Sequence, residues 1–198
     1  MSELSDPSQP RRRRRADAKR SIAAVLDAAA PLLTQNPHAS VDDIARAAGL
    51  TRQTVYAHFP SRAVLLEALT DRATKRILAA LEVADLDNLP AGEALMRLVE
   101  ISWAEFEAAA FLVTSPAVTS LERERDRHEP IRQHLDRLIE RGQRDDDFDS
   151  TLPAAWIAAA TIALGHAAGE QVRTGDMTMT HARTILATSL SRLFTPDQ

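Results

Sequence analysis

The sequence predicts an all-α fold of about nine helices. Alanine and leucine dominate the 198-residue chain, whereas aromatic residues make up only 4% of it, and this composition favours helix over sheet. Apolar residues recur at helical spacing along most of the chain, and no segment alternates apolar and polar residues as a half-buried strand does. These observations predict helices packed around a core of aliphatic side chains.

The overall composition is that of a globular protein. Hydrophobic residues make up 44% of the chain and charged residues 26%, which is too apolar for a largely disordered protein. The chain has no cysteine, which excludes disulfides, thiolate zinc sites and cysteine nucleophiles and fits a reducing compartment. We therefore expect a cytoplasmic protein.

Two segments need a check for export or membrane insertion. The run Arg11–Arg15 is followed by polar residues and not by the apolar stretch of a signal peptide. Residues 150–169 carry no charge, but alanine and glycine make up half of them and Pro153 interrupts them, so the segment is too weakly apolar for a membrane span. It is predicted to be a helix packed between other helices.

The amino-terminal part of the chain predicts one long helix and two short ones. Residues 1–15 are polar and are expected to form a disordered basic arm. A helix then runs from Ala16 to the Asn36-Pro37 stop. Ser40 and Thr51 are positioned as N-caps of two short helices, and Ser61 as the N-cap of a long fourth helix. Further helices are predicted around residues 91–112, 117–124, 129–142, 153–173 and 179–194.

Charge is distributed unevenly between the two ends. Residues 1–62 hold ten Lys and Arg against six Asp and Glu, whereas residues 63–198 hold 14 against 22. A basic amino-terminal third on an acidic remainder suggests a polyanion-binding module joined to a part that does not bind polyanions.

The two short helices between Val41 and Pro60 have the layout of a helix-turn-helix. Ala45 is small where the helices approach, and Gly49 permits the positive φ of the turn. The outer face of the second helix presents Arg52, Gln53 and Thr54 along with Tyr56. Arginine can bond guanine, glutamine can bond adenine, and hydroxyl groups can reach phosphates. Two helices of an ordinary bundle would show the same spacing of small and apolar residues, so this spacing alone does not distinguish them from a DNA-binding helix-turn-helix.

The same segment resembles the amino-terminal domain of the TetR family of bacterial transcriptional regulators. The resemblance covers residues 16–66 and lies in Ser40-Val41-x-x-Ile44-Ala45-x-x-Ala48-Gly49-Leu50-Thr51-x-x-Thr54-Val55-Tyr56-x-His58-Phe59-x-Ser61-Arg62-x-x-Leu65-Leu66. Two positions depart from the family's usual pattern. Arg62 stands where a lysine is usual, and Asn36-Pro37-His38 replaces a glycine and an aromatic residue.

The resemblance implies which residues contact DNA. Arg52 and Gln53 would read bases from the major groove, and the helix amino termini at Val41 and Ser61 would face phosphates. The arginine run would reach an adjacent minor groove or follow the phosphates, although it could also be a solvated tail. Phe59 is expected in the core. The residues expected to hold the DNA backbone are Ser40, Thr51, Thr54, Tyr56, His58 and Arg62.

The resemblance also implies a homodimer and a small-molecule effector. Residues 16–62 would form the DNA-binding domain, and residues 63–198 the ligand-binding and dimerisation domain, with the last two helices as the interface. The residues suggested for that interface are Ala158, Ala159, Gly165, Ala168, Gly169, Leu190, Leu193 and Phe194. The residues suggested for the ligand pocket are Trp103, Phe106, Phe111, Trp156 and His166.

The expected function is a ligand-responsive repressor that binds a palindromic operator, with no enzymatic activity. No phosphate-binding glycine loop, nucleophile elbow, zincin motif or complete calcium loop occurs, so no cofactor and no metal are expected. The alternatives are a helical small-molecule-binding protein with a vestigial helix-turn-helix, an activator, and a regulator controlled by a protein partner.

Overall fold

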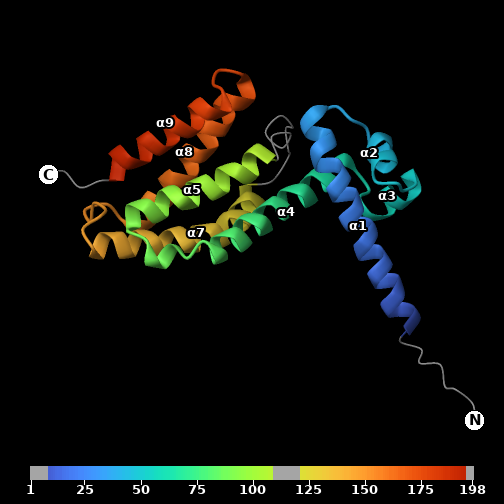
Figure 1. Ribbon diagram of the computed structural model, residues 1–198, viewed down its shortest axis with the longest axis horizontal. Helices are drawn as coiled ribbons and strands as arrows, with labels where there is room; N and C mark the ends of the chain where they lie inside the picture. The colour runs from blue at the N-terminus through green and yellow to red at the C-terminus, as the bar shows by residue number, and fades with distance from the viewer. Residues whose placement is uncertain (1–8, 109–120, 195–198) are drawn as a thin grey trace, which may run out of the picture. The chain divides into compact units, whose positions relative to one another are not determined.

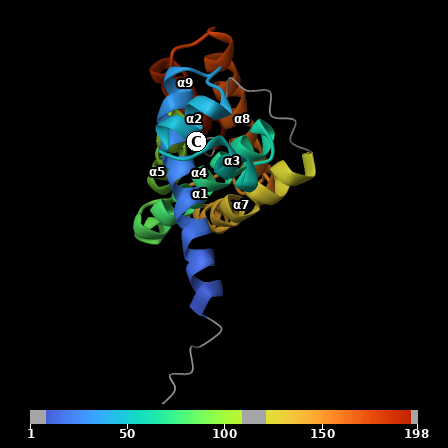
Figure 2. The same cartoon turned by 90° about the vertical axis from the view of Figure 1, so that its right-hand side faces the viewer.

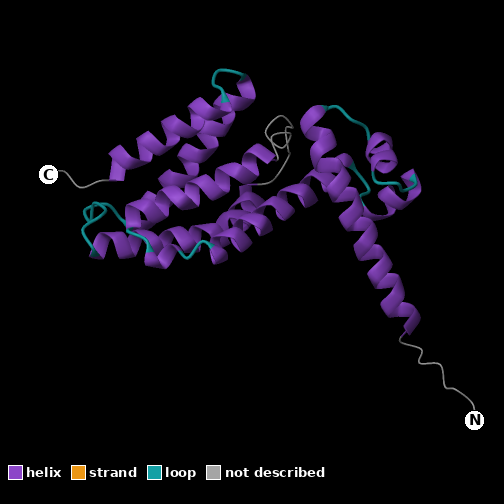
Figure 3. Ribbon diagram, in the orientation of Figure 1, coloured by secondary structure: helices purple, strands orange, loops and turns teal. Residues whose placement is uncertain are grey.

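The computed structural model describes residues 9–108 and 121–194, and every regular element within these ranges is a helix (Figure 3). The all-α prediction is confirmed. The described ranges contain eight α-helices and one short 3-10 helix. The chain divides into two compact units, Met1–Leu69 and Thr70–Gln198.

The first unit is built from α1 (Gln9–Gln35), α2 (Val41–Ala47), α3 (Arg52–His58) and the first turns of α4 (Arg62–Val83). Helix α1 packs against both short helices, which also pack against each other (Figures 1 and 2). Their shared core is aliphatic, apart from one phenylalanine. Its buried members are Val25, Leu26, Ala29, Leu33, Ala39, Val41, Ile44, Ala45, Val55, Phe59, Leu65, Leu66 and Leu69.

Helix α1 begins earlier than the sequence suggested. The predicted disordered arm ended at residue 15, but the helix starts at Gln9 and includes the whole arginine run. Arginine is a good helix former, and extending a helix that packing has already fixed costs far less than nucleating one. The basic segment is thus a helical extension of α1 from Gln9 onward, and Arg12–Arg15 are exposed on it.

The second unit contains the rest of α4, η1 (Leu86–Asn88), α5 (Ala91–Ala108), α7 (Leu121–Arg144), α8 (Ala154–Thr174) and α9 (Met179–Phe194). Helix α5 packs against α7 and α9, and α8 packs against the same two helices. Buried residues from α5, α7, α8 and α9 form one continuous core that includes Trp103, Leu135, Ile157 and Leu190.

Helix α7 replaces two predicted helices. The sequence suggested a break between residues 124 and 129, yet the helix runs from Leu121 through Pro130 to Arg144. A proline inside a helix removes one backbone hydrogen bond, and side chains on both sides of it hold this helix in place. Arg127 pairs with Asp71 of α4 at 3.2 Å, and Arg132 pairs with Glu129 at 2.7 Å. Residues 117–120 and 109–112 of the predicted helices lie outside the described residues.

The uncharged segment at residues 150–169 forms most of α8, which packs against α7 and α9. Within the ranges that the structure covers, no helix has the length and apolar character needed to cross a membrane.

Candidate nucleic-acid interface and ligand pocket

Local hydrogen bonds fix the ends of α2 and the turn that follows it. The Ser40 hydroxyl accepts from the Asp43 amide at 3.2 Å, and the Asp43 carboxylate accepts from the Ser40 amide at 2.9 Å. The side-chain hydrogen bond from the Ser40 hydroxyl, together with the amide bond, holds the pKa of Asp43 below its usual value. Gly49 adopts a φ of +66°, which a side chain would strain. The predicted cap and the predicted turn glycine are both confirmed.

Packing fixes the angle between α2 and α3. Ile44 and Val55 are fully buried, Ala45 is 3% exposed, and Phe59 is buried at the end of α3. The Leu50 amide donates to the Ala45 carbonyl at 2.9 Å and closes the turn. The small residue and the apolar contacts lie where the helix-turn-helix interpretation placed them, and Phe59 is a core residue as predicted.

The opposite face of α3 is open to solvent. Thr51, Arg52, Gln53 and Tyr56 are exposed, and Thr51 caps the helix by accepting from the Thr54 amide at 3.2 Å. Arg52 and Gln53 therefore stand on the first turn of an exposed helix. His58, the last residue of α3, is half-buried beside Phe59, with the ring centroids 6.5 Å apart.

Arg52 is held by two neighbouring side chains. Its Nη1 donates to Asp42 Oδ2 of α2 at 2.9 Å, and its guanidinium carbon lies 5.1 Å from the centre of the Tyr56 ring. Asp42 is not among the residues for which the family resemblance implied a DNA contact. The approach of α2 to α3 is what brings residues 42 and 52 together.

Arg62 makes contacts that differ from its predicted role. Its guanidinium donates to the backbone carbonyls of Pro37 and Ala39, in the loop between α1 and α2. The half-buried side chain thus ties the start of α4 to the residues just before the Ser40 cap. Two of its donors are occupied within the protein, which reduces its capacity to bind a phosphate.

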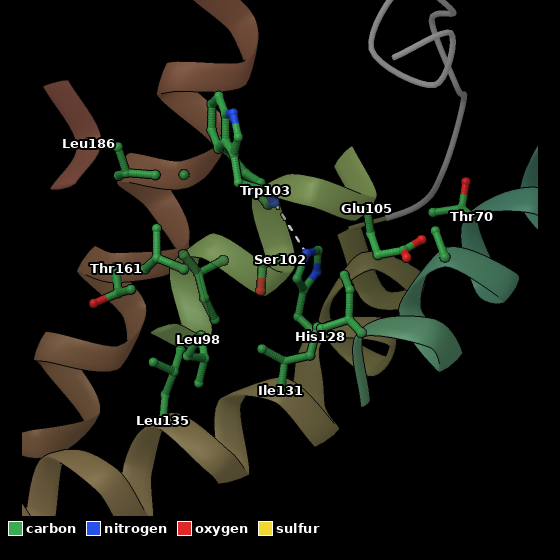
Figure 4. A pocket seen from close by; sticks show the side chains of 16 residues that line it. Thr70, Leu98, Ser102, Trp103, Glu105, His128, Ile131, Leu135, Thr161 and Leu186 are labelled. Carbon is green, nitrogen blue, oxygen red and sulfur yellow. Dashed lines mark hydrogen bonds between the residues drawn. The ribbon is translucent and has the colours of Figure 1, made fainter. Parts of the chain in front are cut away.

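The second unit contains a partly open cavity of about 300 Å³ between α4, α5, α7, α8 and α9 (Figure 4). Aliphatic side chains and Trp103 form most of its wall, and Figure 4 shows Leu98, Ile131 and Leu135 among them. Polar side chains contribute at a few points only. These are Thr70, Ser102, Glu105, His128, Thr161 and His166.

The polar groups of the cavity differ in their hydrogen-bond and ion-pair partners. The Nε2 atoms of His128 and His166 are 3.2 Å apart, so the two rings share one hydrogen bond across α7 and α8. Glu105 pairs with Arg76 at 3.1 Å. The Ser102 hydroxyl is shielded from solvent and has no hydrogen-bond partner among the described residues. An apolar ligand with one polar or charged group fits such a wall.

The predicted pocket residues are divided between three places. Trp103 and His166 line the cavity. Trp156 does not line it and is 62% exposed, because it lies in the first turn of α8, whereas the cavity borders residues 161–166 of that helix. Phe111 and the side chain of Phe106 lie outside the described residues. Glu105 and His128 could not be identified from the sequence, since only the packing of separate helices brings them to one cavity.

No metal site is evident in the part of the chain that the structure describes, where no three His, Asp or Glu side chains cluster closely enough to hold an ion.

Comparison with known proteins identifies the first unit. Residues 25–69 match the family described as "Bacterial regulatory proteins, tetR family". Residues 25–69 thus form a TetR-family domain. The match covers α2, α3 and the turn between them, which are the elements that the sequence motif had indicated.

Several TetR-family relatives are similar to this chain. It is 43% identical over 82 residues to the HTH-type transcriptional repressor LfrR of Mycolicibacterium smegmatis, covering 41% of this chain and 43% of LfrR. It is 36% identical over 112 residues to the regulator EthR of the same organism, covering 54% of this chain and 51% of EthR. The chain thus aligns with about half, or less, of the length of these relatives.

Solved structures extend the similarity to both units. LfrR in complex with proflavine has a TM-score of 0.64 at 28% identity, covering 87% of this chain and 95% of LfrR. A putative transcriptional regulator from Saccharomonospora viridis in complex with choline has a TM-score of 0.71 at 25% identity, covering 89% of this chain and 98% of that chain. These relatives are transcriptional regulators, and this TetR-family assignment confirms the prediction that the chain is not an enzyme.

Proposed function

We propose that the protein is a transcriptional repressor that binds a palindromic operator as a homodimer and is released by a small molecule in its second unit. The exposed first turn of α3, with Arg52 and Gln53 on a helix-turn-helix fixed by two caps and a glycine turn, carries the proposal. The similarity to the repressor LfrR supports the mode of regulation. Two copies of α3 would enter major grooves about 34–36 Å apart, or at a multiple of that spacing, and operator binding would place the protein in the cytoplasm.

The test of this proposal is the loss of operator discrimination in α3 variants. Arg52→Ala and Gln53→Ala should each reduce the preference for a selected operator over unrelated DNA by about 1–3 kcal/mol, the value of a good base contact. A duplex that the protein selects from a random-sequence library serves as the operator in a titration. Lys75→Ala removes an exposed cation of the second unit and should leave the preference intact. If both α3 variants discriminate like the parent, α3 does not read the bases.

The arginine-rich start of α1 is proposed as a phosphate contact. Replacing Arg12–Arg15 with glutamine should flatten the dependence of binding on salt, because each lost phosphate contact removes about 0.9 from the slope of log K against log salt. Glutamine is also a good helix former, so the helix should persist. A titration over several salt concentrations measures the slope, and an unchanged slope would assign this extension no role in binding.

Exposed apolar residues of α8 and α9 support the proposed dimer. Trp156 is 62% exposed, Leu193 54% and Ile185 41%, and an apolar face of this kind is a frequent mark of a protein interface. Exposed alanines at positions 159, 163 and 167 continue from Trp156 along α8 at helical spacing and would allow a second helix to approach closely.

Several residues suggested for the interface from the sequence are wrong. They belong to the core of the single chain because α8 and α9 pack their small and apolar faces against each other and against α5 and α7. The buried residues are Ala158, Ala168, Gly169, Leu190 and Phe194. Ala159 and Leu193 are exposed, and Gly165 lines the cavity.

We propose an organic cation as the effector. The complexes of LfrR with proflavine and of the Saccharomonospora viridis regulator with choline involve cationic ligands. In this chain Trp103 and Glu105, which pairs with Arg76, line the same cavity, and aromatic rings and carboxylates are the groups that attract organic cations.

The effector proposal predicts reciprocal coupling between proflavine and DNA. Proflavine should weaken operator binding by about 1–3 kcal/mol, and saturating operator should weaken proflavine binding by the same factor. Fluorescence titration of proflavine with and without the selected operator measures both, once a titration of the operator duplex alone has corrected for intercalation of proflavine into DNA. Glu105→Gln should lower the affinity for proflavine and leave operator binding without proflavine unchanged. Equal affinity for proflavine in both conditions would contradict release by this ligand.

A further inference from the structure

The structure shows an acidic residue beside the proposed base-reading arginine. Asp42 lies in the first turn of α2, and its Oδ2 accepts from Arg52 Nη1 at 2.9 Å. The face of Tyr56, one turn further along α3, lies 5.1 Å from the same guanidinium. The Arg52 side chain is nevertheless 65% exposed, so the group is held at one end and open to solvent at the other.

This pair adds little to the fold. An ion pair as exposed as this one contributes little to stability. The other carboxylate oxygen, Oδ1, is shielded from solvent and has no hydrogen-bond partner among the described residues, which is an unfavourable state for a charged acceptor. A contribution to stability therefore does not explain why an aspartate stands at position 42.

We propose that Asp42 is a positioning residue that sets the base specificity of Arg52. The inference rests on the proposed operator binding. A guanidinium is a rigid planar fork, so one bond from Nη1 to Asp42, with the centre of the Tyr56 ring 5.1 Å from its carbon, restricts where its remaining donors point. Nη2 and Nε then approach DNA already oriented and can form the paired hydrogen bonds to guanine O6 and N7. A free arginine would lose more conformational entropy on making the same contact.

The Asp42 carboxylate also weakens binding to DNA of unrelated sequence. A negative group at the protein–DNA boundary is repelled by phosphates and keeps Arg52 from binding them as a free cation would. Asp42 therefore lowers affinity for any DNA and raises the preference for guanine at the position that Arg52 reads. A residue that matters only for folding would change both affinities in the same direction.

The experiment determines base preference and affinity in Asp42→Asn, Arg52→Ala and the double variant. Each full-length protein selects duplexes from a random-sequence library, and its affinity is measured for the duplex selected by the parent and for an unrelated duplex. Asp42→Asn should reduce the guanine preference about tenfold at one position in each half-site and should tighten binding to the unrelated duplex. In the Arg52→Ala background, the same substitution should leave the base preference unchanged.

Asp17→Asn is the control, because Asp17 carries the same charge on α1 of the same unit and pairs with Arg20, not Arg52. It should tighten binding to the unrelated duplex without altering the guanine preference. If Asp42→Asn instead tightens operator binding and keeps the preference, Asp42 competes with DNA for Arg52 and the proposal is overturned. An unchanged preference with unchanged affinities overturns it equally. A parent protein that selects no sequence contradicts the proposed function itself, which is a distinct result.

Discussion

Replacing Ala163 with glutamate is expected to convert the proposed dimer to a monomer at micromolar concentration. Ala163 is exposed on α8, in line with Trp156 and the exposed alanines 159 and 167. A two-fold axis through this face would bring the new carboxylate close to its symmetry copy in an apolar contact. Burying an unpaired charge there should cost about 3 kcal/mol or more of association free energy, roughly a hundredfold in the dissociation constant.

Analytical ultracentrifugation or light scattering of the intact protein measures this change. Since Ala163 is exposed in the single chain, the substitution should leave the helix content and the thermal midpoint of the monomer close to those of the parent. Ala79→Glu introduces the same charge at an exposed alanine of α4 and should remain dimeric. A parent that is already monomeric at this concentration would contradict the dimer, and a dimeric Ala163→Glu would place the interface elsewhere.

Loss of the dimer should also weaken operator binding. Two linked reading helices engage two half-sites, so the second contact forms at a high effective concentration. A monomer should bind the full operator about as weakly as it binds a single half-site, whereas the parent should prefer the full operator by one hundredfold or more. The comparison of full and half-site duplexes separates loss of the dimer from damage to α3, because damage lowers both affinities.

The helix-turn-helix could be predicted from the sequence because its signals are local. Ser40 and Thr51 cap their helices through bonds to residues three positions further on, and Gly49 marks the turn by a backbone conformation that other residues avoid. Helical spacing also identified the buried faces, including Ile44, Val55 and Leu186. Such patterns depend on neighbours within one or two turns, and one sequence contains them completely.

The cavity could be predicted only in part, because it depends on contacts between distant segments. Glu105 and His128 reach one cavity only when α5 and α7 pack together. Trp156 was selected for its size on an alanine-rich helix, but size does not indicate which face of a helix borders a cavity. Aromatic residues also mark interfaces, and the exposure of Trp156 fits that role.

The contacts of Arg62 in the first unit could not be predicted from the sequence either. A cation at the start of the fourth helix was expected to contact a phosphate, since helix position and charge are visible in the sequence. Its bonds to the carbonyls of Pro37 and Ala39 span more than twenty residues, so no local pattern reveals them. These carbonyls belong to the loop in which Asn36-Pro37-His38 departs from the usual family pattern.

Arg62→Ala is expected to destabilise the first unit and, through it, operator binding. The substitution removes two hydrogen bonds from a charged donor to half-buried carbonyls, each worth about 1.5–3 kcal/mol. With a reduction for partial exposure, we expect a loss of about 3 kcal/mol, or roughly 10 °C or more in the midpoint for a unit of this size. Arg46→Ala, which removes a cation of α2 whose side chain is 78% exposed, should change the midpoint little.

Two readouts separate this structural role from a phosphate contact. Arg62→Lys keeps the charge but replaces a planar fork with a single ammonium group, which cannot match both carbonyls in the same geometry. If Arg62 acts by holding the loop before Ser40, the lysine variant should remain destabilised, and the salt slope of operator binding should equal that of the parent. If Arg62 instead binds a phosphate, lysine should restore affinity, and Arg62→Ala should lower the slope by about 0.9 for each protomer.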